Sequence, residues 1–67
     1  MEYEVTVGLG CGPRARRILE EAGYDVDGPF RGCTIETLFV LNASPDDDVQ
    51  LLLWEHGFGY ARVDRVG

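Results

Sequence analysis

The sequence contains no lysine, so its positive charge comes from six arginines, set against twelve acidic residues. The formal net charge is therefore −6 at pH 7. A protein that binds nucleic acid through phosphates needs a basic face that releases counterions. The deficit of positive charge argues against direct nucleic-acid binding. It favours a larger protein partner with a basic surface.

Long hydrophobic runs are also missing. The longest, residues 38–41 and 51–54, have four residues each, whereas a helix that spans a bilayer needs about 20. The first four residues are acidic and alternating and do not resemble a signal peptide. We therefore expect no membrane partner and a cytoplasmic location. With 67 residues, of which 45% are hydrophobic, the chain is expected to fold as a single domain, residues 1–67.

Cysteine is scarce, with only Cys11 and Cys33, whereas small secreted domains usually carry several disulfides. We expect both thiols to be free and to lie at opposite ends of the sheet. The position of Cys11 is similar to that of the metal loop in small heavy-metal-binding domains, which use a Cys-x-x-Cys pair. Here the second position is Arg14, and one thiol does not make a soft-metal site. We expect no metal and no cofactor.

Catalytic and nucleotide-binding motifs are absent as well. No Gly-Lys-Ser/Thr follows a glycine loop, and residues 8–12 (GLGCG) lack the third glycine of the dinucleotide fingerprint at its proper spacing. The single histidine, His56, is expected to cap helix carbonyls or to pack against the core. Because acid, base and nucleophile candidates do not converge, we expect a protein that is not an enzyme.

The strand signals that are present fall in four segments. Clean alternation predicts a half-buried strand at residues 2–7. A second strand at residues 24–30 contains Pro29, which indicates an edge strand or a bulge. Residues 34–42 give the strongest strand signal, with apolar side chains on both faces, as in a central strand. Residues 58–66 alternate less cleanly and are predicted to form the last strand.

Two helices are predicted between these strands. The first begins with Pro13 in its first turn and ends at Gly23. The second begins with Ser44 as its cap and Pro45 in first position, and it ends at Gly57. Their buried faces are expected to comprise Ala15, Ile18, Leu19 and Ala22 in the first helix and Val49, Leu52, Leu53 and His56 in the second.

The order β-α-β-β-α-β predicts an α+β, ferredoxin-like fold. In this arrangement a four-stranded antiparallel sheet carries two helices on one face. The fold hosts many unrelated activities and does not by itself specify a function.

Three arginines and three glycines gather in residues 8–17, where the first strand meets the first helix. Backbone N–H groups at a helix start attract anions, and arginine adds fork-shaped donors. An anion or an acidic group of a partner would then be contacted by Gly10, Gly12, Arg14, Arg16 and Arg17. The competing interpretation is a solvated ladder of ion pairs, Arg16 with Glu20 and Arg17 with Glu21.

An exposed apolar surface is predicted on the second helix. At 100° per residue, Leu51 and Trp54 fall opposite the buried face, beside Asp47 and Glu55. Tryptophan is enriched among interface hot spots, so we expect these four residues to form a protein interface. Alternatively, Trp54 folds down over the edge of the helix.

The open side of the sheet is a further candidate. Leu38 and Val40 are expected on the face opposite a core side that comprises Ile35, Phe39 and Leu41. One face is therefore expected to expose apolar residues or to be covered by a second copy. RNA-recognition domains share the topology but use a basic, aromatic sheet face. Glu2, Glu4 and Glu36 are expected to line this side, which argues against RNA.

Two hypotheses about function follow. The first is a small acidic protein-binding module, of the kind by which phages and mobile elements inhibit a nucleic-acid-binding host complex such as a CRISPR effector. The alternative is a regulatory module that binds a small anion at residues 8–17.

Overall fold

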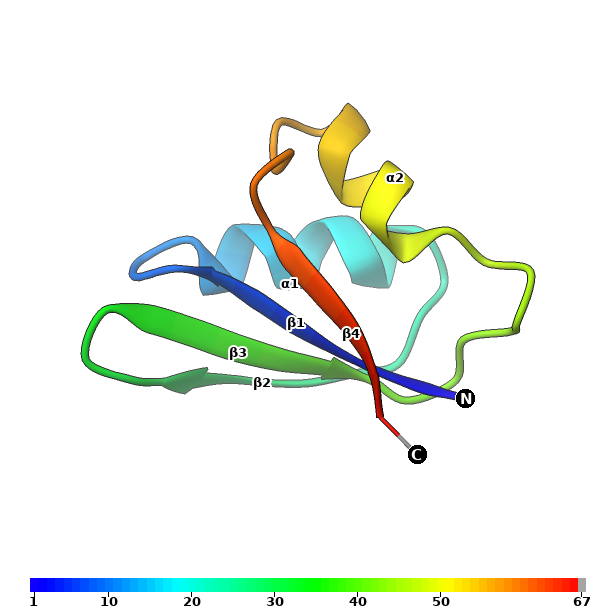
Figure 1. Ribbon diagram of the computed structural model, residues 1–67, viewed down its shortest axis with the longest axis horizontal. Helices are drawn as coiled ribbons and strands as arrows, with labels where there is room; N and C mark the ends of the chain where they lie inside the picture. The colour runs from blue at the N-terminus through cyan, green and yellow to red at the C-terminus, as the bar shows by residue number, and fades with distance from the viewer. Residues whose placement is uncertain (67) are drawn as a thin grey trace.

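The structure, a computed structural model, describes residues 1–66. The chain forms β1 (Glu2–Gly8), α1 (Gly12–Glu21), β2 (Val26–Arg31), β3 (Ile35–Val40), α2 (Val49–Glu55) and β4 (Arg62–Val66). The strands form one antiparallel sheet in the order β2-β3-β1-β4 (Figure 1). The predicted α+β class, with a four-stranded antiparallel sheet and two helices, is confirmed.

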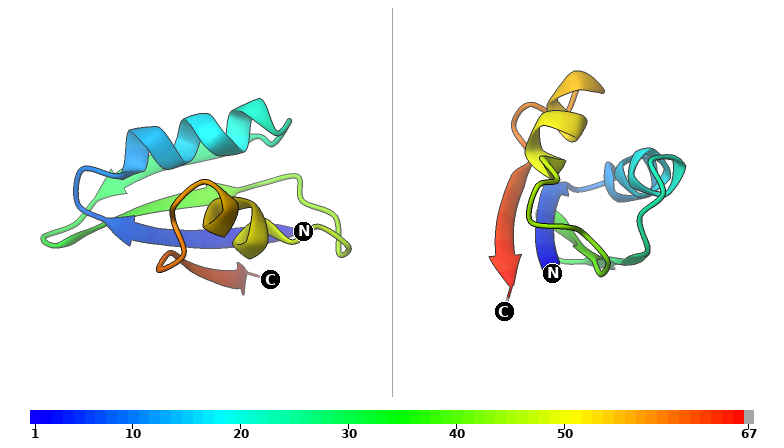
Figure 2. Two further views of the ribbon diagram at one scale, coloured as in Figure 1. Left: turned by 90° about the horizontal axis from the view of Figure 1, so that it is seen from above. Right: turned by 90° about the vertical axis from the view of Figure 1, so that its right-hand side faces the viewer.

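Both helices lie on the same side of the sheet, as Figure 2 shows. Helix α1 contacts β1, β2 and β3, whereas α2 contacts β4. Side chains from both helices join one buried cluster with Val5 and Val7 of β1 and Leu38 and Val40 of β3. Within residues 1–66 no helix lies over the other side of the sheet (Figure 2).

The two faces of β3 are the reverse of the predicted assignment. Val5 of β1 pairs with Leu38, and residues paired in this way point to the same side of the sheet. The buried valines of β1 therefore draw Leu38 into the core and leave Ile35 and Phe39 on the open side. The pattern of residues did not decide between the two faces, because both faces of this strand carry apolar side chains.

Helix α1 follows the prediction over most of its length. Cys11 is the N-cap without a side-chain hydrogen bond, and a proline occupies the first turn. Ala15, Ile18 and Leu19 are buried as expected. Ala22 is exposed, contrary to the prediction, because it is the C-cap and lies beyond the last turn. Gly23 ends the helix with φ of +97°, as predicted.

Helix α2 begins at Val49, four residues later than predicted. Its cap is Asp48, whose Oδ1 accepts a hydrogen bond from the Leu51 N–H at 2.9 Å. Ser44 instead belongs to a separate turn, in which its N–H donates to Asp47 Oδ2 at 2.8 Å and the Asp47 N–H donates to the Ser44 carbonyl at 3.0 Å. Serine and aspartate favour caps and turns alike, so the sequence pattern did not distinguish the two.

The C-terminal end of α2 is only partly as predicted. Val49 and Leu53 are buried, whereas His56 is exposed and does not pack in the core. Its Nδ1 lies 2.9 Å from the Leu52 carbonyl oxygen, so its predicted contact with helix carbonyls is confirmed. Gly57 follows with φ of +91° and ends the helix.

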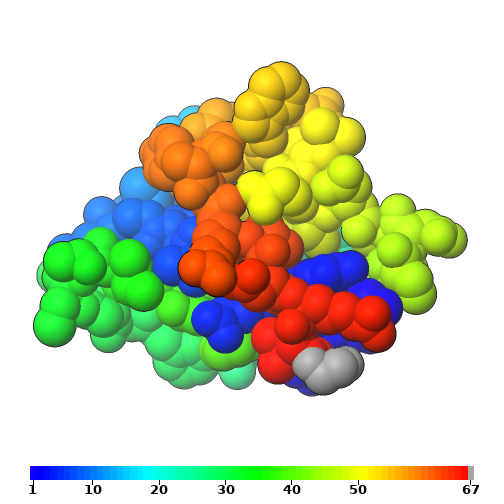
Figure 3. Space-filling model, viewed as in Figure 1, coloured from blue at the N-terminus to red at the C-terminus, as the bar shows by residue number. Residues whose placement is uncertain are grey.

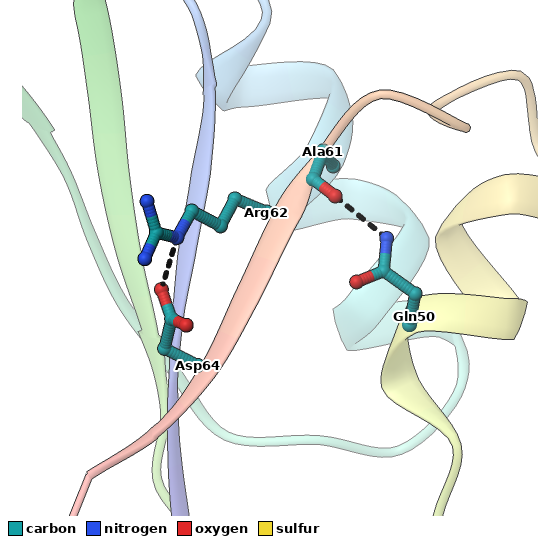
Figure 4. Close-up of polar contacts among 4 residues, drawn as sticks. All are labelled: Gln50, Ala61, Arg62 and Asp64. Carbon is teal, nitrogen blue, oxygen red and sulfur yellow. Dashed lines mark hydrogen bonds and ion pairs between the residues drawn. The ribbon is translucent and has the colours of Figure 1, made fainter.

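The two outer strands also differ in how well they were predicted. β2 is an edge strand with a register irregularity between Asp27 and Phe30, as the proline indicated. β4 begins at Arg62 rather than at residue 58. Phe58 and Ala61 are buried core residues of the preceding loop. Figure 4 shows how Gln50 Nε2 of α2 holds this loop by donating to the Ala61 carbonyl at 2.6 Å.

Candidate functional site

The glycine loop between β1 and α1 binds a carboxylate of the protein itself. The N–H groups of Gly10 and Gly12 donate to Oε1 of Glu36 at 2.5 and 3.1 Å. Glu36 is only 7% exposed, and among residues 1–66 it is the one charged side chain that is buried. Its predicted place on the open side of the sheet is wrong. An external anion at these two amides would have to displace Glu36.

Glycine is required at position 12 because other atoms approach its backbone closely. A Cβ added to Gly12 would lie 2.6 Å from Cβ of Pro29 and 2.9 Å from Oε2 of Glu36. Gly10 adopts a φ of +89°, which favours glycine. Gly12 is thus explained by the close approach of Pro29 and Glu36, and Gly10 by its backbone conformation.

The three arginines of this segment point to different partners. The Arg14 guanidinium lies over the Phe58 ring, 5.4 Å from its centroid. Arg16 donates to the Gly28 carbonyl and pairs with Glu20 at 3.3 Å, which confirms the predicted Arg16–Glu20 pair.

Arg17 is exposed, and within residues 1–66 it forms no ion pair, so the predicted pair with Glu21 is not observed. Because each arginine has a different surrounding, Arg14, Arg16 and Arg17 do not converge on one ligand position. The site residues predicted at this corner remain a hypothesis.

The two cysteines lie at the same end of the sheet, contrary to the prediction. β1 and β3 are antiparallel, so the end of β1 meets the start of β3 where Gly8 pairs with Ile35. Cys11 follows the first of these strands and Cys33 precedes the second. Both thiols are free, Cys11 half-buried and Cys33 exposed.

The second predicted site, on α2, carries large exposed side chains. Leu51 is 47% and Trp54 62% exposed, and Glu55 beside them is exposed as well. The tertiary structure adds Tyr60, which is 74% exposed and follows Gly59. A Cβ on Gly59 would lie 2.6 Å from Cδ1 of Trp54, so the indole rests against this glycine. We call Leu51, Trp54, Glu55 and Tyr60 the tryptophan patch.

Tyr60 was missed because nothing in the local pattern places the loop after α2 beside the outer face of the helix. That loop is held by Gln50, which reaches the Ala61 carbonyl (Figure 4), and Phe58 anchors it in the core. The sequence signal that could have pointed to Tyr60 was an aromatic residue directly after Gly59 in a loop.

Asp47 does not join this patch as the helical wheel predicted. It precedes α2, and its side chain accepts the Ser44 N–H. Asp47 also acts on Tyr24. Burial raises the pKa of the Tyr24 hydroxyl, and the charge and hydrogen bond of Asp47 and the proximity of Tyr3 add to this increase.

An open hollow of about 360 Å³ lies between the start of α2 and the strands β1 and β4. In Figure 3 the segment preceding α2 lies beside the blue start of β1 and the red β4. The hollow is lined in part by Asp46, Asp47 and Asp48. The side chains of Asp47 and Asp48 already accept hydrogen bonds from backbone N–H groups. Among residues 1–66 no group of three acidic, histidine or cysteine side chains is placed to hold a metal ion.

The side of the sheet without helices, which we call the open face, exposes apolar side chains as predicted, but not the predicted Leu38 and Val40, which are buried. Phe30 is 51% and Ile35 44% exposed, and Leu41 directly after β3 is 44% exposed. Phe30 and Phe39 form an edge-to-face pair with ring centroids 5.9 Å apart. The molecule therefore has two separate apolar surfaces.

Comparison of the chain with protein-family models, with characterised proteins and with solved structures gave no match. Among the helices of residues 1–66, none has the length and apolar character needed to cross a membrane.

Proposed function

We propose that this protein is a small, acidic, non-enzymatic protein-binding module that contacts a larger partner with a basic surface through the tryptophan patch. The observation that supports this most directly is the exposure of Trp54 and Tyr60, at 62% and 74%. Tryptophan and tyrosine are the side chains that most often carry interface energy, because they bury a large rigid area at low entropic cost.

The surroundings of the patch fit a basic partner. Glu55 is exposed beside Trp54, and the whole chain carries −6. Such charge speeds encounter with a positive surface and makes association sensitive to salt. A standard interface takes about 800 Å² from each partner, about a fifth of the 4151 Å² surface of this protein. The tryptophan patch would form the centre of such an interface.

Capture of a partner by immobilised protein tests the proposal. Wild type is compared with Trp54→Ala and with a control, Glu21→Gln, which alters an exposed side chain on the other helix. We expect a basic protein to be retained by wild type and by the control, lost with Trp54→Ala, and released as salt is raised. Equal retention of the partner by wild type and by Trp54→Ala would contradict the proposal. So would the absence of any retained protein.

A narrower proposal concerns the class of partner. An acidic domain that occupies a basic groove would inhibit a nucleic-acid-binding host complex, for example a phage-encoded inhibitor of a CRISPR effector. The net charge of −6 supports it. Addition of the protein to such a complex should release its bound nucleic acid in a gel-shift assay. Unchanged nucleic-acid binding by a complex that demonstrably binds this protein contradicts inhibition.

We likewise propose a ferredoxin-like assignment for the fold. The element order β-α-β-β-α-β and the sheet order β2-β3-β1-β4 support it.

A further inference from the structure

The strand register shows which side chains share the open face. Glu4 of β1 pairs with Phe39 of β3 on one side and with Asp64 of β4 on the other. Asp27 of β2 pairs with Phe39. One row across the sheet therefore reads Asp27, Phe39, Glu4, Asp64, with side chains that point away from the helices because Val5 and Leu38 point toward them.

The next row places a second aromatic ring beside the first. Phe30 of β2 pairs with Thr37 of β3, and Thr37 pairs with Thr6 of β1. Thr6 in turn pairs with Arg62 of β4. The rings of Phe30 and Phe39 meet edge to face, and Phe30 is half exposed. The open face thus has an aromatic half on β2 and β3, and acids lie on both sides of it.

Two of the three acids in the row form no ion pair among the residues that the structure describes. Asp64 pairs with Arg62 at 2.8 Å (Figure 4). Within residues 1–66, Glu4 and Asp27 form no ion pair. Glu4 also lies directly opposite Asp64, and like charges in this position destabilise a sheet. Packing of the domain thus gives no reason for this combination of aromatic rings and carboxylates, of which Phe30 and Asp27 are exposed and Phe39 and Glu4 are half-buried.

We propose that the open face binds an arginine- or lysine-rich segment of a protein partner, with cationic side chains over Phe30 and Phe39 and in ion pairs with Glu4 and Asp27. A guanidinium is attracted both by the face of an aromatic ring and by a carboxylate. The register supplies both to one side chain, because Asp27 and Glu4 are the cross-strand neighbours of Phe39. This surface is separate from the tryptophan patch, and the inference does not depend on it.

Charge complementarity favours this occupant over two others. A second copy would bring its own acidic row against this one, and each chain carries −6. A nucleic acid would bring phosphates to the same carboxylates, which lack the cations that phosphate binding requires. Both occupants remain distinguishable outcomes of the experiment.

The experiment uses a fluorescein-labelled 12-residue peptide of alternating arginine and alanine, titrated into the whole protein. A peptide with glutamate in place of arginine serves as the matched probe. We expect the dissociation constant of the arginine peptide to rise about fivefold or more in the double variant Glu4→Gln/Asp27→Asn. The control Glu21→Gln/Asp46→Asn removes the same charge from exposed acids elsewhere, and it should change the constant less than twofold.

The aromatic contribution is tested separately with Phe30→Ser, which should weaken binding about two- to fivefold. Backbone amide shifts in an NMR titration should map to β2, β3 and β1, and Trp54→Ala should leave the affinity unchanged. Circular dichroism and the dispersion of the amide spectrum confirm that each variant is folded.

Several results would overturn the inference. These are equal weakening by the control pair, no effect of Phe30→Ser, or shifts confined to the tryptophan patch. Equal affinity for the glutamate peptide or for a labelled 12-nucleotide oligouridylate would also contradict it. A dimer in sedimentation of the protein alone, with shifts at Phe30 and Phe39, would assign the face to a second copy.

Discussion

Glu36 illustrates at the scale of a single residue how a buried charge is accommodated. Its side chain is almost completely buried, and its carboxylate accepts hydrogen bonds from two backbone N–H groups at the start of α1. A carboxylate at a helix N-terminus also benefits from the helix dipole. The contact joins β3 to the loop between β1 and α1, so it ties together segments that are distant in sequence.

Replacement of Glu36 by alanine should therefore destabilise the protein by about 2–3 kcal/mol, since the N–H groups of Gly10 and Gly12 lose their acceptor. Glu36→Gln keeps an acceptor oxygen and should cost less. Urea unfolding followed by circular dichroism measures both, with exposed Glu21→Ala as the control. A loss for Glu36→Ala no larger than that of the control would contradict the structural role.

Tyr24 provides a prediction about pH. Its pKa is raised above 10.0 by burial, by Asp47 and by Tyr3. The folded protein thus holds this proton more tightly than the unfolded chain, so the stabilisation is fully present below pH 10 and is lost as pH rises through the higher folded pKa.

Tyr24→Phe should remove this part of the pH dependence. We expect the free energy of unfolding of wild type to fall more steeply than that of the variant as the pH rises above 10.0, as measured by urea titrations at each pH. Asp47→Asn should lower the folded-state pKa of Tyr24, so the pH range over which stability is lost should become narrower at its upper end. Parallel curves for wild type and Tyr24→Phe would refute this account.

At the scale of the element, α2 shows how two adjacent polar signals compete. Ser44 and Asp48 are both acceptable N-caps, and residues 44–48 contain three aspartates. The hydrogen bonds assign the cap to Asp48 and a separate turn to Ser44 and Asp47. The helix is shorter as a result, with seven residues, and its outer face begins after Asp47.

The cap assignment predicts a contrast between two alanine variants. Asp48→Ala should lower the free energy of unfolding by about 1 kcal/mol, since the Leu51 N–H loses its acceptor. Ser44→Ala should change it by less than about 0.5 kcal/mol, because only the backbone of Ser44 takes part in the turn. Thermal and urea unfolding measure the loss of stability in both variants. A larger loss for Ser44→Ala than for Asp48→Ala would contradict the assignment of the cap to Asp48.

For the whole molecule, the exposed surfaces follow from how the helices cover the sheet. Two helices of ten and seven residues lie over one side of a four-stranded sheet, and within residues 1–66 no helix lies over the other (Figure 2). Apolar side chains on the open face and on the outer side of α2 thus stay exposed. With a net charge of −6, both surfaces are suited to partners that bring positive charge.

The sequence by itself determined the elements and most of their buried faces. Alternation in residues 2–7 and the spacing of Ala15, Ile18 and Leu19 specified a strand and a helix, since each periodicity requires only local geometry. The proline in β2 marked an edge strand for an equally local reason, the missing N–H. The helical wheel of the second helix likewise predicted that Leu51 and Trp54 are exposed.

Only the tertiary structure decided which face of β3 enters the core and where Glu36 lies. Both faces of that strand are apolar, so the choice depends on pairing with β1, a contact between residues about 30 positions apart. The same pairing brings Glu36 to the N–H groups of Gly10 and Gly12. Long-range register likewise assembles Asp27, Phe39 and Glu4 into one row, because strands that are distant in sequence become neighbours only when the sheet forms.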